Sequence, residues 1–577
     1  MMTLFGRPTP VTQRSRRHPY AAGPAAFLLL LTACTGTPSS GPAPEVTSVA
    51  ASPPVAPDTN SPSVSPAPTE NPGSKPLGWG PEQQDADAAT KALAGMSTEQ
   101  KAGQVLVGFY SGADPAAQAS TIQRLHLAGS IVMGDNVPTT ADGAADTAAM
   151  ARSTATLHNA AKADGRTWPG VVAIDQEGGP VARLRAPLTE WPSAMAYGAA
   201  ADPALTRQAG RAMGAELAGL GFTMDFAPDA DVTIGPQDPV IGSRSFSDDP
   251  DAVAAHAVEM SGGLLDAGVL PALKHFPGHG SVTVDSHLGL PVQGAGTAEL
   301  EARDWKPFRA AAAAGLPVMM TGHIDVPALE PGVPASLSKA TYAHLRGLGF
   351  KGVAVTDALN MGAIEQTHSP GEASVASLAA GADLLLMPSD VDAAHAAVVA
   401  AVANGSLPME RLNEAAGRVI TLMTWQGRRA AVAPPAAPGS GEPVSAAVSA
   451  KAVTVLAGPC SGRLVGDSVQ VRGGSERDRA RFAAAAAAAG LAVGSGPVVR
   501  LLGPGASVAA GGGHADIDVA LDAPWAVAGS PAGSVMAVYG RSPGSFGALV
   551  SVLTGTAGAP GKLPVAAGVL PRGAGCT

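Results

Sequence analysis

Short apolar runs recur through the middle of this 577-residue chain, and amphipathic stretches with helical spacing separate most of them. Two such stretches extend from Pro203 to Leu220 and from Asp251 to Ala267. Runs without polar alternation are typical of strands buried on both faces of a parallel sheet. Eight strand–helix units predict an α/β fold, a (β/α)₈ barrel. The eight runs are Val105–Val107, Ile131–Met133, Val171–Ile174, Met224–Ala227, Ala272–Leu273, Val318–Met320, Val353–Val355 and Leu384–Met387.

A smaller region follows at residues 445–577. It contains apolar runs at Ala452–Leu456 and Val535–Tyr539 and an Ala-rich helical stretch from Arg481 to Ala489. This mixture predicts an α/β layer structure. No set of catalytic residue types stands out there, so we expect a supporting or substrate-capping domain.

Two segments lack the apolar periodicity that a packed element needs. Residues 34–80 consist mostly of Pro, Ser, Thr, Ala and Gly and are predicted to form a flexible tether. Residues 429–444 include Ala433–Gly439, which has three prolines, and are predicted to be a linker. The barrel domain is therefore expected at residues 81–428.

The first 33 residues have the pattern of a signal peptide. A basic stretch ends at Arg17, the apolar run Ala25–Leu31 follows, and Leu31-Thr32-Ala33 precedes Cys34. This last pattern resembles the lipobox of bacterial lipoproteins, which implies that Cys34 is lipidated and anchors the protein to the outer face of the cytoplasmic membrane. An ordinary secretory signal is the alternative.

Charge and the remaining cysteines narrow the picture further. The formal net charge is −10 and the sole basic cluster lies in the signal segment, so nucleic acid is not an expected partner. Cys460 and Cys576 can form a disulfide in an oxidising compartment. Two free thiols remain the alternative, because the distance between them cannot be deduced from sequence.

Charged residues follow several of the predicted barrel strands, at the rim where such barrels place their active sites. They are Asp175, Asp229, Lys274 with His275, His323 and Asp357. A single charged strand end is usually just solvated, but five on one rim predict a cleft dense in titratable groups.

The densest polar segment is Lys274–Gly280, followed by Asp285-Ser286-His287. His275, His279, Asp285 and His287 are all metal-ligand types, but their spacing matches no common signature such as His-Glu-x-x-His. We favour a pair in which Asp285 orients His287 as a general acid and base. Asp357 ends a strand and can attack an anomeric carbon as a nucleophile.

Several motifs together resemble the β-N-acetylglucosaminidase branch of glycoside hydrolase family 3. The resemblance covers Met96 to about Met423, and the segment Gly555–Val565 resembles the end of the family's second, α/β sandwich domain. The motifs of the barrel are Lys274–Gly280 with Asp285–His287, Ile174–Leu184, Phe226–Pro228 and Ile241–Phe246.

The resemblance implies a role for each matching residue. Asp357 would be the nucleophile, His287 the acid and base, and Asp285 its partner, with no metal and no cofactor required. A histidine in this role departs from the two-carboxylate pattern of most glycosidases. Ala358 stands where the family usually has a second acidic residue. The residues expected to bind the sugar are Asp175, Arg183, Arg244, Lys274 and His275.

The expected activity is removal of terminal β-linked N-acetylglucosamine with retention of configuration. Peptidoglycan fragments are the expected partners of an anchored exported enzyme, and chitin fragments are the alternative. An imidazole does not repel an anionic acceptor, so phosphorolysis is a second hypothesis. A non-catalytic wall-binding lipoprotein and a metal-dependent hydrolase are the remaining alternatives.

Overall fold

The computed structural model describes residues 75–508 and 513–576. The predicted signal peptide, Cys34 and the predicted tether up to residue 74 lie outside the described residues. Within the described ranges, no helix is both long and apolar enough to cross a membrane.

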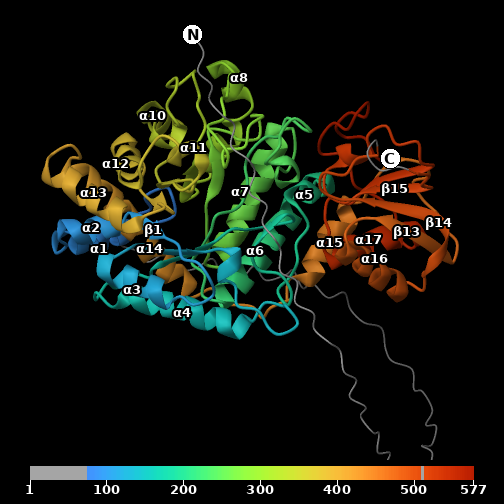
Figure 1. Ribbon diagram of the computed structural model, residues 1–577, viewed down its shortest axis with the longest axis horizontal. Helices are drawn as coiled ribbons and strands as arrows, with labels where there is room; N and C mark the ends of the chain where they lie inside the picture. Colours follow the sequence, from blue (N-terminus) through green and yellow to red (C-terminus); the bar gives the residue numbers. More distant parts are fainter. Residues whose placement is uncertain (1–74, 509–512, 577) are drawn as a thin grey trace, which may run out of the picture. The chain divides into compact units, whose positions relative to one another are not determined.

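Parallel strands form a barrel at the centre of the larger domain (Figure 1). Two arcs of strands, in the orders β11-β1-β2-β3-β6-β7 and β10-β9-β8, are joined by the parallel bridges Asp229–Lys274 and Val355–Leu384. Strands β7 and β8 are separated by a single residue, Ala272, and form one strand of the barrel, so the nine strands make eight staves and confirm the predicted (β/α)₈ barrel. The strands are β1 Leu106–Gly108, β2 Gly129–Val132, β3 Val171–Ile174, β6 Met224–Asp225, β7 Leu270–Pro271, β8 Leu273–Phe276, β9 Val318–Thr321, β10 Val353–Thr356 and β11 Leu385–Leu386.

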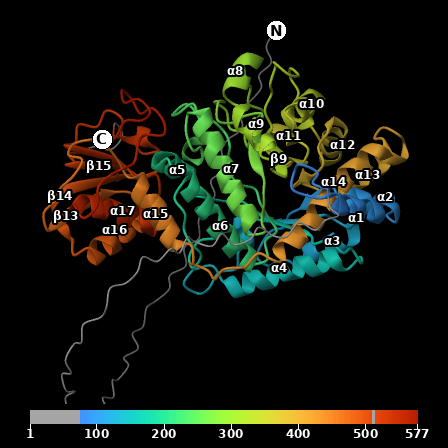
Figure 2. The ribbon, with the colours of Figure 1, turned by 180° about the vertical axis from the view of Figure 1, so that it is seen from behind.

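Helices surround these strands, as both ribbon views show (Figures 1 and 2). The two predicted amphipathic stretches are α6 (Pro203–Gly219) and α7 (Pro250–Asp266), each with an aspartate N-cap followed by proline at the first helical position. The other barrel-domain helices are α1 Gln83–Ala94, α2 Thr98–Gly103, α3 Ala116–Leu125, α4 Thr147–Lys162, α5 Ala194–Ala200, α8 Thr297–Ala302, α9 Lys306–Ala313, α10 Lys339–Gly347, α11 Gly362–Glu365, α12 Pro370–Ala380, α13 Val391–Ala403 and α14 Met409–Ala430.

Alternate residues of each barrel strand belong to two different hydrophobic clusters. In β10, Val353 and Val355 join one cluster, whereas Ala354 joins the other, which includes helix residues such as Leu157 and Leu217. Because side chains alternate across a strand, one cluster fills the barrel and the other lies under the helices. Both faces are apolar, which explains why the strands have no polar alternation.

The C-terminal domain is a five-stranded sheet with helices, which confirms the predicted α/β layer structure. The strand order is β12-β16-β15-β14-β13, and β12 alone pairs antiparallel. Cys460 and Cys576 form a disulfide, with their Cα atoms 5.5 Å apart. The elements are α15 Glu442–Ala452, β12 Thr454–Ala457, β13 Ser468–Gly473, α16 Glu476–Ala488, β14 Ala492–Leu502, β15 Ile517–Ala520, β16 Ser534–Ala537 and α17 Pro543–Thr554.

Both predicted unstructured segments are shorter than expected. Helix α14 continues to Ala430 and α15 begins at Glu442, so residues 431–441 form the connection. The backbone amide of Ala436 donates a hydrogen bond to the carbonyl of Ala215. A proline-rich segment can thus satisfy its backbone polar groups on a folded neighbour. Near the predicted end of the tether, Trp79 is buried in the barrel cluster, so the folded region begins before residue 81.

A fully buried carboxylate, Asp383, ties the wall of the barrel to two helices. It pairs with Arg346 of α10 at 2.6 Å and with Arg411 and Arg418 of α14 at 2.8 and 3.0 Å. It also accepts a hydrogen bond from the backbone amide of Ala354 in β10. Burial alone would raise the pKa of Asp383, but the three guanidinium groups outweigh it and lower the pKa.

We expect Asp383→Ala to lower the free energy of unfolding by about 3–5 kcal/mol, because three guanidinium groups would lose their buried counter-charge. Asp392→Ala is the matched control. Asp392 pairs with Arg124 at the surface, where the side chains are 54 and 55 % exposed, so the loss there should stay below about 1 kcal/mol. Urea denaturation measures both, and equal losses would contradict the assigned role of Asp383.

Candidate functional site

A cavity of about 410 Å³ opens where the barrel strands end, and it brings most of the predicted site residues together. Asp175 follows β3, Lys274 and His275 lie in β8, and Asp357 follows β10. These are carboxyl ends of parallel strands, so they share one rim. Asp285 does not line the cavity, and neither do the predicted rim residues Asp229 and His323. The predicted residues that line it are Asp175, Arg183, Arg244, Lys274, His275, His287 and Asp357.

Asp357 presents a carboxylate to this cavity. Its backbone amide donates to the carbonyl of Thr321 in the neighbouring strand β9, and its Oδ1 accepts a 2.8 Å hydrogen bond from the amide of Ala358. Burial raises the pKa of Asp357, but the electrostatic influence of His275 and then of His323 outweighs it, and the net shift is downward. Asp357 is therefore held ionised, as a nucleophile must be.

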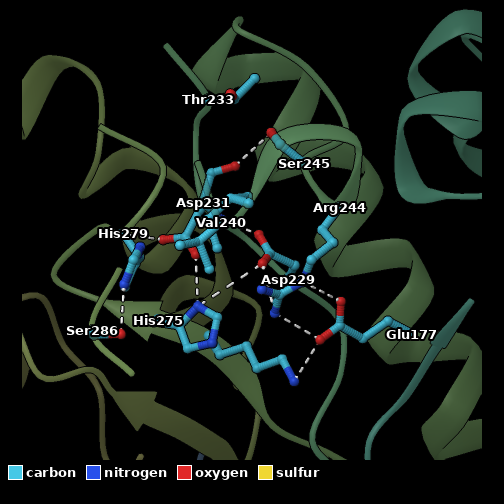
Figure 3. Close-up of polar contacts among 12 residues, drawn as sticks. Glu177, Asp229, Asp231, Thr233, Val240, Arg244, Ser245, His275, His279 and Ser286 are labelled. Carbon is cyan, nitrogen blue, oxygen red and sulfur yellow. Dashed lines mark hydrogen bonds and ion pairs between the residues drawn. The ribbon is translucent and has the colours of Figure 1, made fainter. Parts of the chain in front are cut away.

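Two cations contact Glu177, a residue to which the sequence motifs assigned no role. Its carboxylate pairs with Arg244 through two 2.8 Å hydrogen bonds and with Lys274 at 2.6 Å (Figure 3). Lys274 also donates to Asp175 at 3.0 Å, and Asp175 accepts from Arg183 at 3.0 Å. The cations and carboxylates thus form one continuous network along the floor of the cavity.

This network keeps its members charged. Burial would lower the pKa of Lys274, but Asp175 and Glu177 raise it overall. Burial would likewise raise the pKa of Glu177, and Arg244 with Lys274 lowers it. Charges paired at these distances in a water-poor pocket are fixed in position, so the site is already organised before a ligand arrives.

A second buried carboxylate, Asp231, orients two histidines. It contacts Nδ1 of His275 at 2.7 Å and accepts a 2.6 Å hydrogen bond from the backbone amide of His279 (Figure 3). The imidazole of His279 contacts the Ser286 hydroxyl at 2.8 Å. Burial, followed by the nearby charge of His275, lowers the pKa of His279 to about 4, so this ring is neutral at pH 7.

Asp229 and Asp231 lie two residues apart but titrate in opposite directions. Burial raises the pKa of Asp229 well above its usual value, and the charge of Asp231 adds to this rise. Its closest cation is Arg244, at 3.4 Å. Burial also raises the pKa of Asp231, but the charge of His275 and its hydrogen bond outweigh it. The surroundings of Asp229 therefore disfavour its ionised form, whereas those of Asp231 favour its ionised form.

The predicted pair of Asp285 and His287 is formed. Oδ1 of Asp285 contacts Nδ1 of His287 at 2.7 Å and accepts from its backbone amide at 2.9 Å. Burial would raise the pKa of Asp285, but its hydrogen bonds with His287 lower it. The His287 side chain is 64 % exposed at the mouth of the cavity.

Backbone contacts join the loop of His287 to the segment that follows Asp357. The amide of Gly362 donates to the carbonyl of His287, and that of Ala363 donates to Ser286. The side chain of Gln366 donates to the carbonyl of Leu288 at 2.7 Å. The two catalytic candidates are thus carried by loops that are fastened together.

The alternative metal site at His275, His279, Asp285 and His287 does not correspond to the group of possible ligands in the structure. Across residues 75–508 and 513–576, one group of three donors comes within 4.8 Å, namely Asp229, Asp231 and His275. It shares only His275 with the four residues of the alternative.

Glu177 and Asp231 are the functional residues that sequence reasoning missed. Glu177 lies inside the Ile174–Leu184 motif, two positions after the strand-end residue Asp175, and Asp231 likewise follows the strand-end residue Asp229 by two positions. Position therefore offered a signal for both. Their partners lie 67 and 44 residues away along the chain, so the pairing itself could not be deduced.

Comparisons with known proteins agree with this geometry. The profile of the Glycosyl hydrolase family 3 N terminal domain matches residues 97–422. The chain is 35 % identical to Beta-hexosaminidase A of Pseudoalteromonas piscicida over 336 residues, 52 % of this chain and 55 % of that protein. It is 38 % identical to Beta-hexosaminidase LpqI of Mycobacterium tuberculosis over 338 residues, 57 % of this chain and 83 % of that protein.

A solved structure extends the similarity to both domains. The glycoside hydrolase family 3 beta-N-acetylglucosaminidase from Paenibacillus sp. str. FPU-7 superposes with a TM-score of 0.73 at 29 % identity. The match covers 82 % of this chain and 99 % of that one. The chain spans just over half the length of the Pseudoalteromonas relative and nearly the whole of the Paenibacillus structure.

We expect Asp229→Asn to raise the free energy of unfolding at pH 7 by about 1–3 kcal/mol, because it removes a poorly compensated buried anion. The folded-state pKa of Asp229 is raised, so the free-energy cost of its ionisation in the folded state disappears as the pH falls to the unfolded-state pKa near 4. The stability that Asp229→Asn gains over the wild type should therefore shrink toward pH 4.

The matched variant Asp231→Asn should have the opposite sign, with a loss of about 3 kcal/mol at pH 7. The folded-state pKa of Asp231 is lowered, so its contribution is present above the unfolded-state pKa and is lost as the pH falls. Urea unfolding at pH 7 and pH 4 measures both variants. Shifts of the same sign would show that the two carboxyls do not differ as described.

Proposed function

The chain belongs to glycoside hydrolase family 3, in its β-N-acetylhexosaminidase branch, and we propose that it removes terminal, non-reducing β-linked N-acetylglucosamine with retention of configuration. The observation that carries this proposal is the pairing of an ionised Asp357 in the cavity with the Asp285–His287 pair at its mouth. A nucleophile and a proton donor on fastened loops are the two groups that a retaining glycosidase needs.

The first step forms a covalent intermediate. The Asp357 carboxylate attacks the anomeric carbon while the glycosidic bond breaks, and protonated His287 gives its proton to the departing oxygen. Asp285 holds the imidazole through Nδ1, which leaves Nε2 to face the leaving group. The products of this step are the free aglycone and an α-linked glycosyl ester of Asp357.

The second step releases the sugar. Neutral His287 accepts a proton from water, the water oxygen attacks the anomeric carbon, and the ester bond to Asp357 breaks. Two inversions give net retention of the β configuration. His287 is exposed at the mouth, so water reaches it once the aglycone has left.

The charged network along the cavity floor would bind the sugar hydroxyls. Lys274, Arg183 and Arg244 offer hydrogen-bond donors, and Asp175 offers acceptors, all in fixed positions. His275 faces the same cavity and is oriented by Asp231. Glu177 and Asp231 act as positioning residues, because their contacts are with these binding groups.

Replacing either catalytic candidate separates their roles. Asp357→Asn should reduce hydrolysis of 4-nitrophenyl N-acetyl-β-glucosaminide and of its 2,4-dinitrophenyl analogue more than about a thousandfold. His287→Ala should reduce hydrolysis of unactivated aglycones by about 10²–10⁴-fold, with a much smaller loss on the dinitrophenyl substrate, whose leaving group needs no proton. Steady-state kinetics measures both.

His368→Ala is the matched control, because His368 is near α11 but does not line the cavity. Its activity should equal that of the wild type. Equal losses of His287→Ala on both substrates would contradict its role as proton donor. The same assay with added phosphate detects sugar 1-phosphate if the enzyme is a phosphorylase, and loss of activity with a chelator would favour a metal-dependent hydrolase.

The proposed substrate is a peptidoglycan fragment, and the proposed location is the outer face of the cytoplasmic membrane. Both follow from the lipobox pattern before Cys34 and from the N-acetylglucosamine in the glycan chains of peptidoglycan. If wild type cleaves chitin fragments but no peptidoglycan fragment, the natural substrate is chitin. If it cleaves neither, a non-catalytic wall-binding role becomes the leading hypothesis.

We expect the full chain, expressed in a bacterium with a lipoprotein pathway, to partition into the membrane fraction and to incorporate a labelled fatty acid. Cys34→Ala should abolish the label and move the protein to the soluble extracytoplasmic fraction, because the acyl chains supply the membrane affinity. Cys460→Ala is a control that leaves the label in place. A labelled Cys34→Ala protein would contradict lipidation at this position.

A further inference from the structure

A second cavity, of about 320 Å³, lies between the barrel domain and the C-terminal domain, and its wall carries four arginines. Arg185 comes from the barrel domain, Arg477 and Arg481 come from α16, and Arg541 precedes α17. No step of the proposed hydrolysis uses these residues. A concentration of guanidinium groups in one cavity is a feature typical of sites that bind carboxylates or phosphates.

The arginines are only partly neutralised by their neighbours. Glu190 pairs with Arg477 at 3.0 Å, is hydrogen-bonded to Arg481 and lies 3.7 Å from Arg185, so three guanidinium groups share one carboxylate. Arg541 pairs with Asp478 at 2.6 Å.

The third carboxyl of the cavity, Asp522, adds little negative charge in mild acid. Burial raises the pKa of Asp522 to about 6, and its Oδ2 has no hydrogen-bond partner among the described residues. Burial lowers the pKa of Arg185, Glu190 raises it, and repulsion from Arg477 and Arg481 lowers it again. An anion entering the cavity would relieve that repulsion.

The two cavities share a wall. Strands β4 (Gln176–Gly178) and β5 (Val181–Ala182) form a hairpin, and its turn, Gly179-Pro180, lines the arginine cavity. Glu177 and Arg183, on either side of that turn, line the sugar cavity. The two cavities therefore lie on opposite sides of one short hairpin.

We propose that the arginine cavity binds a carboxylate on the leaving-group side of the substrate and so selects acidic aglycones over neutral ones. This inference rests on the proposed function. In peptidoglycan fragments, the residue that follows N-acetylglucosamine carries a lactyl group, whose carboxyl is either a free carboxylate or is joined through an amide bond to a peptide with its own carboxylates. Either source offers the same chemistry to a guanidinium group.

Three substrates test the proposal and distinguish the two sources. They are neutral N,N′-diacetylchitobiose, N-acetylglucosaminyl-N-acetylmuramic acid, and the same disaccharide carrying a peptide. The variants are Arg185→Gln, Arg477→Gln and the double variant, whose side chains are 39 and 52 % exposed in the wild type and tolerate replacement. Arg479→Gln is the matched control, because Arg479 is exposed on the same helix and does not line the cavity.

The readout is the ratio of kcat/KM for each acidic substrate to that for chitobiose. We expect this ratio to fall about 5- to 20-fold for each arginine removed, mainly through KM, and to be unchanged in Arg479→Gln. It should also fall with rising salt in the wild type. A fall confined to the peptide-bearing substrate assigns the carboxylate to the peptide. A fall confined to the peptide-free disaccharide assigns it to the lactyl group, whose carboxylate is free only there, and a fall for both shows that the site accepts a carboxylate from either source.

Variants with the wild-type ratio on both acidic substrates would overturn the anion site while leaving the glycosidase intact. So would equal losses on acidic and neutral substrates. A wild type that cleaves none of the three, nor the 4-nitrophenyl substrate, would instead overturn the proposed function itself.

Discussion

The proposed catalytic cavity depends on two buried carboxylates that compensate its positive charges. Glu177 pairs with Lys274 and Arg244 and offsets the free-energy cost of burying their charges, and the orientation of His275 depends on Asp231. Asp231 thereby also acts on Asp357, because His275 is the largest factor that offsets the rise in the pKa of Asp357 caused by burial. Neither carboxylate needs to contact the substrate. Their contribution is to fix charge before binding, so that little reorganisation remains for the reaction.

The fold could be predicted where the chain shows a strong pattern and less well where it does not. Barrel strands such as Val353–Thr356 are apolar on both faces, and helices such as α6 begin with an aspartate followed by proline, so both were found close to their observed positions. The boundaries of the domains were predicted less accurately. Trp79 and the connection at 431–441 lie in proline-rich sequence, and whether such residues are ordered depends on a folded neighbour that composition does not reveal.

The site divides in the same way between local and distant contacts. Asp285 and His287 are two residues apart, and their contact at 2.7 Å followed from that spacing. Glu177 and Arg244, 67 residues apart, meet only because the barrel closes. The residues with assigned roles were those in recognisable motifs, whereas the groups that hold them were identified only from the structure. Contacts between residues that are far apart in the sequence depend on the topology of the fold, and they cannot be deduced from a single sequence.

The proposed nucleophile and the proposed proton donor have contrasting environments. A nucleophile must stay in one position and one charge state, and Asp357 accepts a hydrogen bond from the amide of Ala358 and has a lowered pKa. The proposed mechanism requires His287 to exchange protons with an aglycone and then with water, and its side chain is largely exposed on a loop that is hydrogen-bonded to the segment after Asp357. Because this loop belongs to the barrel, the C-terminal domain need not supply a catalytic acid. Its surface facing the barrel is free for another purpose, and the arginines gathered there suit the recognition of a charged aglycone.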